Sequence, residues 1–345
     1  MSSSFQNTSV KVYDNLGTAQ KKVDVYAPPE NQAFPLQGYP VVFYVHGGAW
    51  HVGDKQNAQQ TCQALAQEGY VSVAASYSLS CMSNPQMEAI LGVVIIVMLA
   101  LALTSRSVTQ MMLVFVLMVI IVFFFVILWM FLPREHVEHP DHILDVAQAF
   151  RWTVDHIEEY GGDPNKIYVV GHSAGGHLAA LLSTNFHYLD SVGVTPDKVR
   201  ACVAISGVYS DKRMQQTRLG TQLLLNAFGH RKHYYDAFPV YNVTKDTPPF
   251  LLINAGMDIS LKRHTLDLHY VLRQSGVFVE TEYFENKSHW NIMHGWKRDN
   301  AVLSKIQNFI EEVEEYYHER ALAGYHDTST HDTSTPEVSA TASPA

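Results

Sequence analysis

The stretch that decides the fold is IYVVGHSAGG at residues 167–176. Its first four residues are apolar and β-forming and predict a buried strand, while the small residues from Ala174 onward predict a helix. Between them, the pattern G-x-S-x-G places Ser173 on a sharp strand-to-helix turn that only flanking glycines can accommodate. The turn exposes the hydroxyl at a helix N-terminus, where the backbone N–H of Ala174 can bind an oxyanion. The alternative is a Gly/Ser turn without chemistry.

Outward from this stretch, strand and helix patterns alternate along the chain. Strands are predicted at 10–13, 23–27, 41–45, 71–75, 201–205, 250–254 and 277–284, and helices at 58–68, 139–160, 174–183, 265–274 and 301–317. This alternation predicts an α/β fold with a mostly parallel sheet and helices on both faces. The aromatic-rich segment 211–247 is less regular, and we interpret it as a cap.

A second glycine motif, HGGAW at 46–50, follows the strand predicted at 41–45. Glycines leave their backbone N–H groups unshielded, so Gly47 and Gly48 are expected to form an oxyanion hole together with Ala174. Losing one such donor costs about 3 kcal/mol of transition-state stabilisation. The motif by itself also fits an ordinary turn, and the combination with the serine turn makes it specific.

Together with GGDP at 161–164 and GHSAGG at 171–176, the HGGAW motif resembles the α/β-hydrolase carboxylesterases of hormone-sensitive-lipase type. Within that group, the Trp of HGGAW and KSH at 287–289 are similar to the isoprenylcysteine methylesterases and kynurenine formamidases. The resemblance implies an α/β-hydrolase fold and a serine esterase activity without a cofactor. It covers roughly residues 11–317, except for an apolar insert.

The chain order Ser, Asp, His of this fold selects two further residues. Asp258 follows the strand at 250–254, and His289 follows the strand that ends near 284, so both are expected at the sheet edge that carries Ser173. His289 would act as the base and Asp258 would orient it. His294 competes for the role of base, and Asp258 could instead cap a helix.

Two aromatic residues are candidates for the substrate pocket. Trp50 follows the oxyanion glycines, and Tyr209 lies just before the cap segment. Aromatic residues in such positions are as commonly part of the core. His172, beside the nucleophile, could tune the serine turn, but the preferred interpretation is a packed or surface histidine.

Charge and composition exclude several function classes. There are 24 Lys and Arg against 33 Asp and Glu, a formal net charge of −9, and no basic stripe, so a nucleic-acid partner is not expected. The three cysteines lack metal-like spacing, and neither a phosphate-binding loop nor an HExxH pair occurs. The sequence therefore predicts no metal and no cofactor, and it leaves the oligomeric state open.

The segment 89–132 interrupts the pattern, because Arg106 is its only charged residue. A membrane-spanning helix needs roughly 20 apolar residues. Of the two apolar runs, 111–132 is long enough and 89–103 is marginal. We expect a transmembrane helical hairpin between two parts of a catalytic domain, 1–88 and 133–323, followed by a disordered tail at 324–345. The alternative is an insert foreign to the fold that the domain tolerates.

The expected location is a multi-pass membrane protein with its catalytic domain in the cytosol and the endoplasmic reticulum as a candidate compartment. Residues 89–132 would be the membrane partner. The predicted function is a serine carboxylic-ester hydrolase that acts on a lipid-like or membrane-borne ester, such as a prenylcysteine methyl ester. An arylformamidase or amidase using the same residues is the alternative enzyme, and a non-catalytic, membrane-tethered binding protein with this fold is the alternative of another class.

Overall fold

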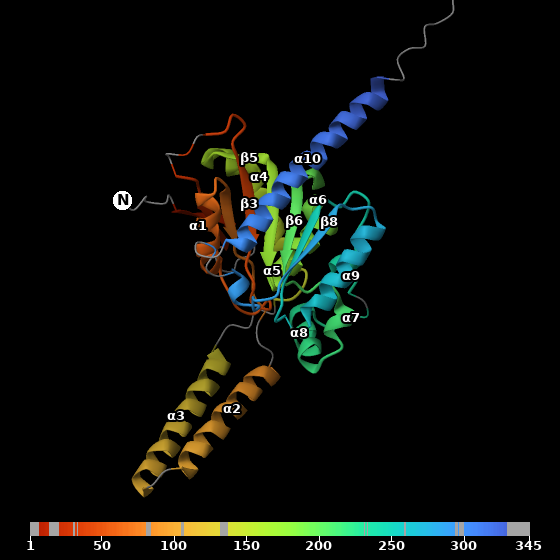
Figure 1. Cartoon of the computed structure of the whole chain (residues 1–345). Coiled ribbons are helices and arrows are strands. Elements are labelled where there is room, and N and C mark those ends of the chain that lie inside the picture. Colours follow the sequence, from red (N-terminus) through yellow and green to blue (C-terminus); the bar gives the residue numbers. More distant parts are fainter. Residues whose placement is uncertain are drawn as a thin grey trace, which may run out of the picture.

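The structure of the chain is a computed structural model. It describes residues 7–13, 21–29, 32, 34–80, 84–104, 107–131, 137–230, 232, 234–258, 260–293, 296 and 300–329. Within this part of the chain, helices and strands alternate as the sequence predicts, and they build one sheet with helices on both of its faces (Figure 1).

The sheet has eight strands in the order β1-β2-β4-β3-β5-β6-β7-β8. β1 pairs with β2 and β2 with β4 in antiparallel fashion, and all other neighbours are parallel. The prediction of a mostly parallel α/β sheet is confirmed. The strands are β1 (Asn7–Tyr13), β2 (Lys21–Tyr26), β3 (Tyr39–Val45), β4 (Val71–Ala75), β5 (Gly162–His172), β6 (Val199–Ile205), β7 (Phe250–Ala255) and β8 (Val279–Phe284).

Alternating residues of the central strands belong to two separate hydrophobic cores, one on each face of the sheet, because successive side chains of a strand point to opposite faces. In β5, Val169 packs with the helices α4 and α5, whereas Tyr168 packs with α1 and α10. The helices are α1 (Gln59–Gln67), α4 (Asp141–His156), α5 (Ala174–Thr184), α6 (His187–Ser191), α7 (Asp211–Met214), α8 (Arg218–Phe228), α9 (Leu261–Gln274) and α10 (Ala301–Ser329). Strands buried on both faces read as continuous apolar runs, which is why they were recognisable in the sequence.

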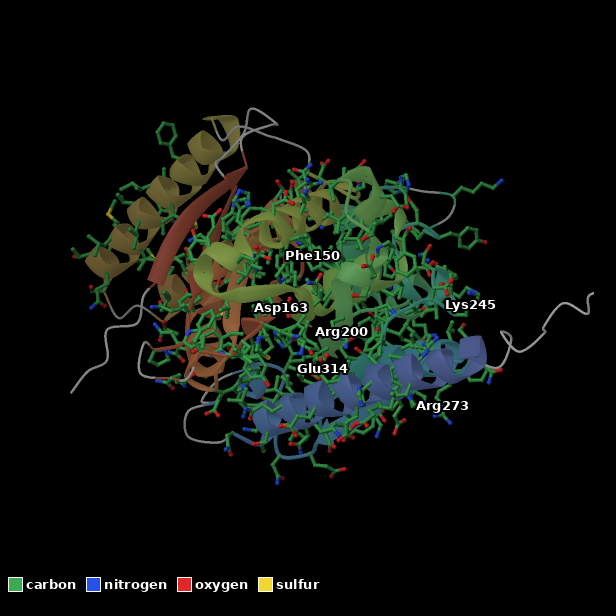
Figure 2. The ribbon with its side chains drawn as sticks, turned by 90° about the horizontal axis from the view of Figure 1, so that it is seen from above. Phe150, Asp163, Arg200, Lys245, Arg273 and Glu314 are labelled. Carbon is green, nitrogen blue, oxygen red and sulfur yellow. The ribbon has the colours of Figure 1, made fainter. Side chains whose placement is uncertain are left out.

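The long helix α10 crosses one face of the sheet (Figure 2). Glu314 of α10 accepts a hydrogen bond from Arg200 of β6 at 2.7 Å and forms an ion pair with Lys166 of β5 at 3.0 Å. The helix continues to Ser329, so it extends beyond residue 324, where the tail is predicted to begin. Residues 330–345 of the predicted disordered tail lie outside the described residues.

The insert forms two helices, α2 (Asn84–Leu103) and α3 (Val108–Phe131), between β4 and α4. They lie side by side and stand away from the sheet (Figure 1). A crossing needs a single helix with about 20 predominantly apolar residues. Among the residues that the structure describes, no helix combines the necessary length with the necessary apolar character. The prediction of a transmembrane hairpin at 89–132 is therefore wrong, and so are the membrane partner and the multi-pass localisation inferred from it.

Candidate active site

Ser173 occupies the turn between β5 and α5. Its backbone has φ 57°, a left-handed conformation that is costly for a residue with a side chain. The turn leaves no room for a side chain at its two glycines. A Cβ at Gly171 would lie 2.1 Å from the Gly175 carbonyl oxygen, and a Cβ at Gly175 would lie 2.1 Å from the Val45 carbonyl oxygen. The backbone N–H of Ser173 also donates to Ile205 O at 2.8 Å. The two glycines of the motif thus let the strand, the turn and the helix approach closely.

His289 lies in the loop after β8 and faces the nucleophile candidate. Its Nε2 is 3.0 Å from Ser173 Oγ, and its Nδ1 is 2.8 Å from Asp258 Oδ1. With the proton on Nδ1, the ring donates to the carboxylate and accepts from the hydroxyl. The structure therefore brings together the three side chains that chain order selected. His294 lies outside the described residues.

The Asp258 carboxylate is enclosed by donors. Oδ1 accepts from His289, and Oδ2 accepts from the Ser206 hydroxyl and from the Ala255 N–H at 3.0 Å. Burial on its own would raise the pKa of Asp258, but the hydrogen bonds from His289 and Ser206 outweigh burial and lower it. The carboxylate is thus held in its charged form next to the imidazole.

Ser206 is a site residue that the sequence analysis missed. It is fully buried, it directly follows β6, and its φ of 48° is left-handed. This conformation aims the hydroxyl at Asp258, which is 52 residues further along the chain. The available signal was its position, because β6 neighbours both β5 and β7 and its carboxyl end lies at the same sheet edge.

The loop after β3 carries the glycines predicted to bind an oxyanion. A Cβ at Gly47 would lie 3.1 Å from Ser173 Cβ, so the loop packs directly against the serine turn. Gly48 has φ 131°, and a Cβ there would lie 1.7 Å from Val52 O. Within the described part of the chain, the backbone N–H groups of Gly47, Gly48 and Ala174 donate to no other protein group. These three donors are available to a ligand oxygen beside Ser173.

His46 packs against this loop and makes contacts with Gly47 and Tyr77. Its Nδ1 is 2.8 Å from Gly47 O, and its ring stacks on Tyr77 with centroids 4.4 Å apart. The Tyr77 hydroxyl donates to the His46 carbonyl at 3.1 Å. Burial lowers the pKa of His46, so its ring is neutral and its contact with Gly47 is a donated hydrogen bond.

The two pocket candidates are buried. Trp50 is 1% exposed and makes edge-on contacts with His177 and Phe228. Tyr209 is fully buried, and its hydroxyl accepts from the Gly207 N–H at 3.1 Å. Both residues lie in the core on the α4 and α5 side, so their contact with a substrate stays a prediction.

Two cavities help to locate the region where a substrate could bind. One of about 590 Å³ lies at the amino ends of the strands and is lined by Asp163 and Arg200 among others, at the sheet edge opposite to Ser173. Figure 2 labels these two lining residues. Another of about 450 Å³ lies in the cap segment after β6 and is lined by Tyr234, Tyr235 and Tyr241 among others. Only the second is on the side of the carboxyl ends, where ligands of open α/β sheets bind.

Chemically, this arrangement can move a proton and stabilise a negative oxygen. Ser173 and His289 are within hydrogen-bond distance, a buried carboxylate can stabilise the imidazolium, and the loop that carries Gly47 packs against the serine turn. Among the described residues, no group of three or more His, Cys, Asp or Glu could hold a metal ion.

A family model described as BD-FAE matches residues 23–90 and 107–268. The matched residues contain the HGGAW motif, Ser173 and Asp258, and they end before His289.

Relatives with similar sequences include enzymes of two kinds. The probable carboxylic ester hydrolase LipM of Mycobacterium tuberculosis is 28% identical over 79% of this chain, and the chain spans only 54% of LipM. The kynurenine formamidase of Danio rerio is 22% identical over 83% of this chain and 76% of its own length. An isoprenylcysteine alpha-carbonyl methylesterase of Arabidopsis thaliana is 36% identical, over 20% of this chain and 17% of its own.

Among solved structures, a bacterial heroin esterase superposes with a TM-score of 0.61 at 19% identity, over 90% of this chain and 84% of the other. At this identity the similarity establishes the fold, and the activity has to be argued from the site.

Proposed function

The chain belongs to the BD-FAE family, and from that premise we propose that it is a serine carboxylic-ester hydrolase. The resemblance to the α/β-hydrolase carboxylesterases is confirmed by the family model and by relatives such as LipM. Because the chain spans about half of LipM, its own activity has to be supported by its site. The observation that carries the proposal is the continuous series of hydrogen bonds from Asp258 through His289 to Ser173.

In the proposed reaction, Ser173 Oγ attacks the ester carbonyl while His289 Nε2 takes the hydroxyl proton. The carbonyl oxygen becomes an oxyanion that accepts from the N–H groups of Gly47, Gly48 and Ala174. His289, now an imidazolium beside the Asp258 carboxylate, gives its proton to the leaving alkoxide. The C–O bond breaks, and the acyl group stays on Ser173.

Hydrolysis of the acyl-enzyme uses the same groups. Water attacks the acyl carbon while His289 removes one of its protons, and the same oxyanion donors stabilise the second tetrahedral intermediate. When that intermediate collapses, the proton returns to Ser173 Oγ and the carboxylic acid leaves. The 23% exposure of the His289 side chain gives water a path to the ring.

The proposed substrate is an ester that the cap segment holds next to Ser173. The tyrosine-lined cavity of about 450 Å³ is large enough for a small organic molecule. The local similarity to an isoprenylcysteine methylesterase supports a prenylcysteine methyl ester as the first substrate to test. The similarity to a kynurenine formamidase supports a formamide as the second, because amide cleavage needs the same groups.

A fluorophosphonate probe tests the proposal, because it phosphonylates only an activated serine. We expect the wild-type chain to be labelled and Ser173→Ala to be unlabelled. Ser191→Ala is the matched control, since the Ser191 hydroxyl donates to Tyr188 O away from the site. No labelling of the wild type would indicate a binding protein that retains the fold. A panel of p-nitrophenyl esters, a prenylcysteine methyl ester and N-formylkynurenine then ranks substrates by kcat/KM.

A further inference from the structure

The side chain of His172 connects the nucleophile turn to the loop that carries the base. His172 is the last residue of β5 and is 7% exposed. Its Nε2 lies 2.9 Å from the backbone carbonyl oxygen of His289, and the two rings are tilted by 41° with centroids 4.7 Å apart. A carbonyl oxygen only accepts, so Nε2 carries a proton and donates it.

The other side of the same ring faces the oxyanion loop. A Cβ built on Gly47 would lie 3.0 Å from His172 Nδ1 and 2.9 Å from the His172 carbonyl oxygen. No side chain other than hydrogen fits at position 47 without displacing the imidazole or the strand end. The ring of His172 therefore lies between the loop with the oxyanion donors and the loop with His289, and it is attached to the backbone of Ser173.

Two backbone hydrogen bonds of the His289 loop lie on the Asp258 side. Met257 N donates to Lys287 O at 3.2 Å, and Gly256 N donates to Phe284 O at 2.9 Å. These two hydrogen bonds join the loop to the end of β7 and involve no residue of β5. The distance between the His289 backbone and β5 therefore depends on contacts from the serine turn. The His172 hydrogen bond supplies such a contact at the backbone of the residue whose ring must meet Ser173 Oγ.

We propose that His172 is a positioning residue that sets the distance between the base, the nucleophile and the oxyanion donors. This inference rests on the proposed function. Losing the bond lets the His289 backbone move away from β5, and a displacement of about 1 Å in such a group can cost about 100-fold in rate. The distance matters most in the transition state, so we expect the loss to fall on kcat and to leave KM nearly unchanged.

Two side chains of nearly equal length separate this role from simple packing. In His172→Gln the amide nitrogen can replace Nε2 as a donor to His289 O, whereas His172→Met fills similar space without a donor. We expect His172→Met to lose about 30- to 100-fold in kcat on a p-nitrophenyl ester, with KM within about twofold of wild type. His172→Gln should recover kcat to within about fivefold.

The rate of fluorophosphonate inactivation is measured in parallel, because it reports the Ser173–His289 pair without substrate binding. It should fall with kcat in His172→Met and recover in His172→Gln. Urea unfolding verifies that each variant is folded, and His172→Leu replaces the methionine variant if that one is not.

Equal kcat values for the Met and Gln variants, or a Met variant with wild-type kcat, would overturn the positioning role. The proposed function fails separately. It is refuted if Ser173→Ala still hydrolyses the ester or is still labelled, whereas wild-type kcat in His172→Met together with an inactive Ser173→Ala refutes only the role of His172.

Discussion

The carboxyl edge of the sheet and the α2–α3 hairpin differ in what their side chains contact. At the sheet edge, hydrogen bonds join the side chains of Ser206, Asp258, His289 and Ser173 in one series. In the hairpin, large apolar side chains are exposed on both helices; Leu113 is one example, with 72% of its surface accessible.

The difference shows what each kind of pattern can establish. A chemical site needs particular atoms at particular places, so few residue types satisfy it and a motif is informative. An apolar run needs only burial of some kind, so its composition predicts a helix but does not identify what the helix contacts. The predictions below test whether activity and stability depend on the first region and are independent of the second.

The largest effect is expected for Asp258→Asn. An amide in place of the carboxylate no longer accepts the His289 Nδ1 proton in the same way, so the ring adopts a tautomer that cannot accept from Ser173. We expect kcat to fall by about 10⁴-fold, the magnitude known for this substitution in serine proteases. Steady-state kinetics on a p-nitrophenyl ester measure it.

Asp163→Asn is the matched control for this change. Asp163 is also buried, but it lies at the amino ends of the strands and accepts from the Asn165 N–H at 2.8 Å (Figure 2). Its kcat should stay near that of the wild type. A loss of less than tenfold in Asp258→Asn would contradict the role assigned to the carboxylate.

The next effect is a loss of stability in acid that originates in the sheet domain, meaning the described residues outside the hairpin 84–131. His264 Nδ1 accepts from the backbone N–H groups of Tyr209 and Ser210, both at 3.2 Å, so its ring must be neutral. Burial lowers the pKa of His264 to about 4 and that of His177 to about 3. Between those values and the usual pKa near 6.5, the unfolded chain binds protons that the folded chain does not.

The unfolding free energy should therefore decrease as the pH falls below about 6.5, by up to about 1.4 kcal/mol per pH unit for each histidine. Urea unfolding at several pH values between 4.5 and 7.5 measures the slope. His264→Gln should reduce this slope by the contribution of about one proton taken up on unfolding. His187→Gln, which alters an exposed ring on α6, should leave the slope unchanged. An unchanged slope in His264→Gln would show that this ring does not titrate on unfolding.

A smaller effect on catalysis is expected for Ser206→Ala. The change removes a hydrogen bond that fixes the orientation of Asp258 Oδ2, and it raises the pKa of Asp258 toward its usual value. A carboxylate that is free to turn holds the His289 ring less firmly. A hydrogen bond to a charged group contributes about 1.5–3 kcal/mol, so kcat should fall by roughly 10- to 100-fold.

Ser206→Gly is an informative companion variant. Glycine removes the strain of φ 48° but also lacks the hydroxyl, so it should lose activity as alanine does. Ser183→Ala, which removes a hydroxyl that donates to Ala179 O within α5, is the control. Full activity in Ser206→Gly would mean that the backbone conformation, and not the hydroxyl, matters at this position.

The same comparison explains how much could be predicted from the sequence. The parallel sheet and the residues 173, 258 and 289 followed from apolar runs that end in particular polar residues, and the structure places these side chains in mutual contact. Ser206 was missed because its partner is distant in sequence and its left-handed backbone has no local signature. For Trp50 and Tyr209 the pocket role stays a prediction, because aromatic residues suit both a pocket and a core and local sequence does not distinguish the two.

The hairpin was misjudged for a related reason. Its apolar runs correctly indicated two helices, but the step from apolar helix to membrane crossing added a partner that composition does not specify. The bounds of α10 show a similar limit, because the polar residues after 324 predicted disorder while the helix continues to Ser329. Continuation of a helix depends on the turns before it, which a composition argument does not include.

The smallest effect is expected when the hairpin is removed, because the sheet domain holds both of its ends. Ser80 Oγ lies 2.8 Å from His142 Nε2, the Ser78 N–H donates to Asp145 at 2.7 Å, and the His139 N–H donates to Ala227 O at 2.8 Å. The first two contacts join the chain before α2 to α4, and the third fixes the chain before α4 to α8; none of them uses a residue of the hairpin.

Replacing residues 84–131 with a flexible Gly/Ser linker of about ten residues should therefore leave kcat/KM on a short p-nitrophenyl ester within about threefold of wild type, since closing such a loop costs little. Fluorophosphonate labelling of Ser173 in the deletion variant verifies that the site is assembled, and urea unfolding verifies the fold. If labelling persists at the wild-type rate while kcat/KM falls more than tenfold, the hairpin takes part in substrate binding, and the separation of the two regions does not hold. A deletion variant that also retains the acid slope would place both activity and pH-dependent stability in the sheet domain, because the groups responsible for each lie in contacts that the hairpin does not make.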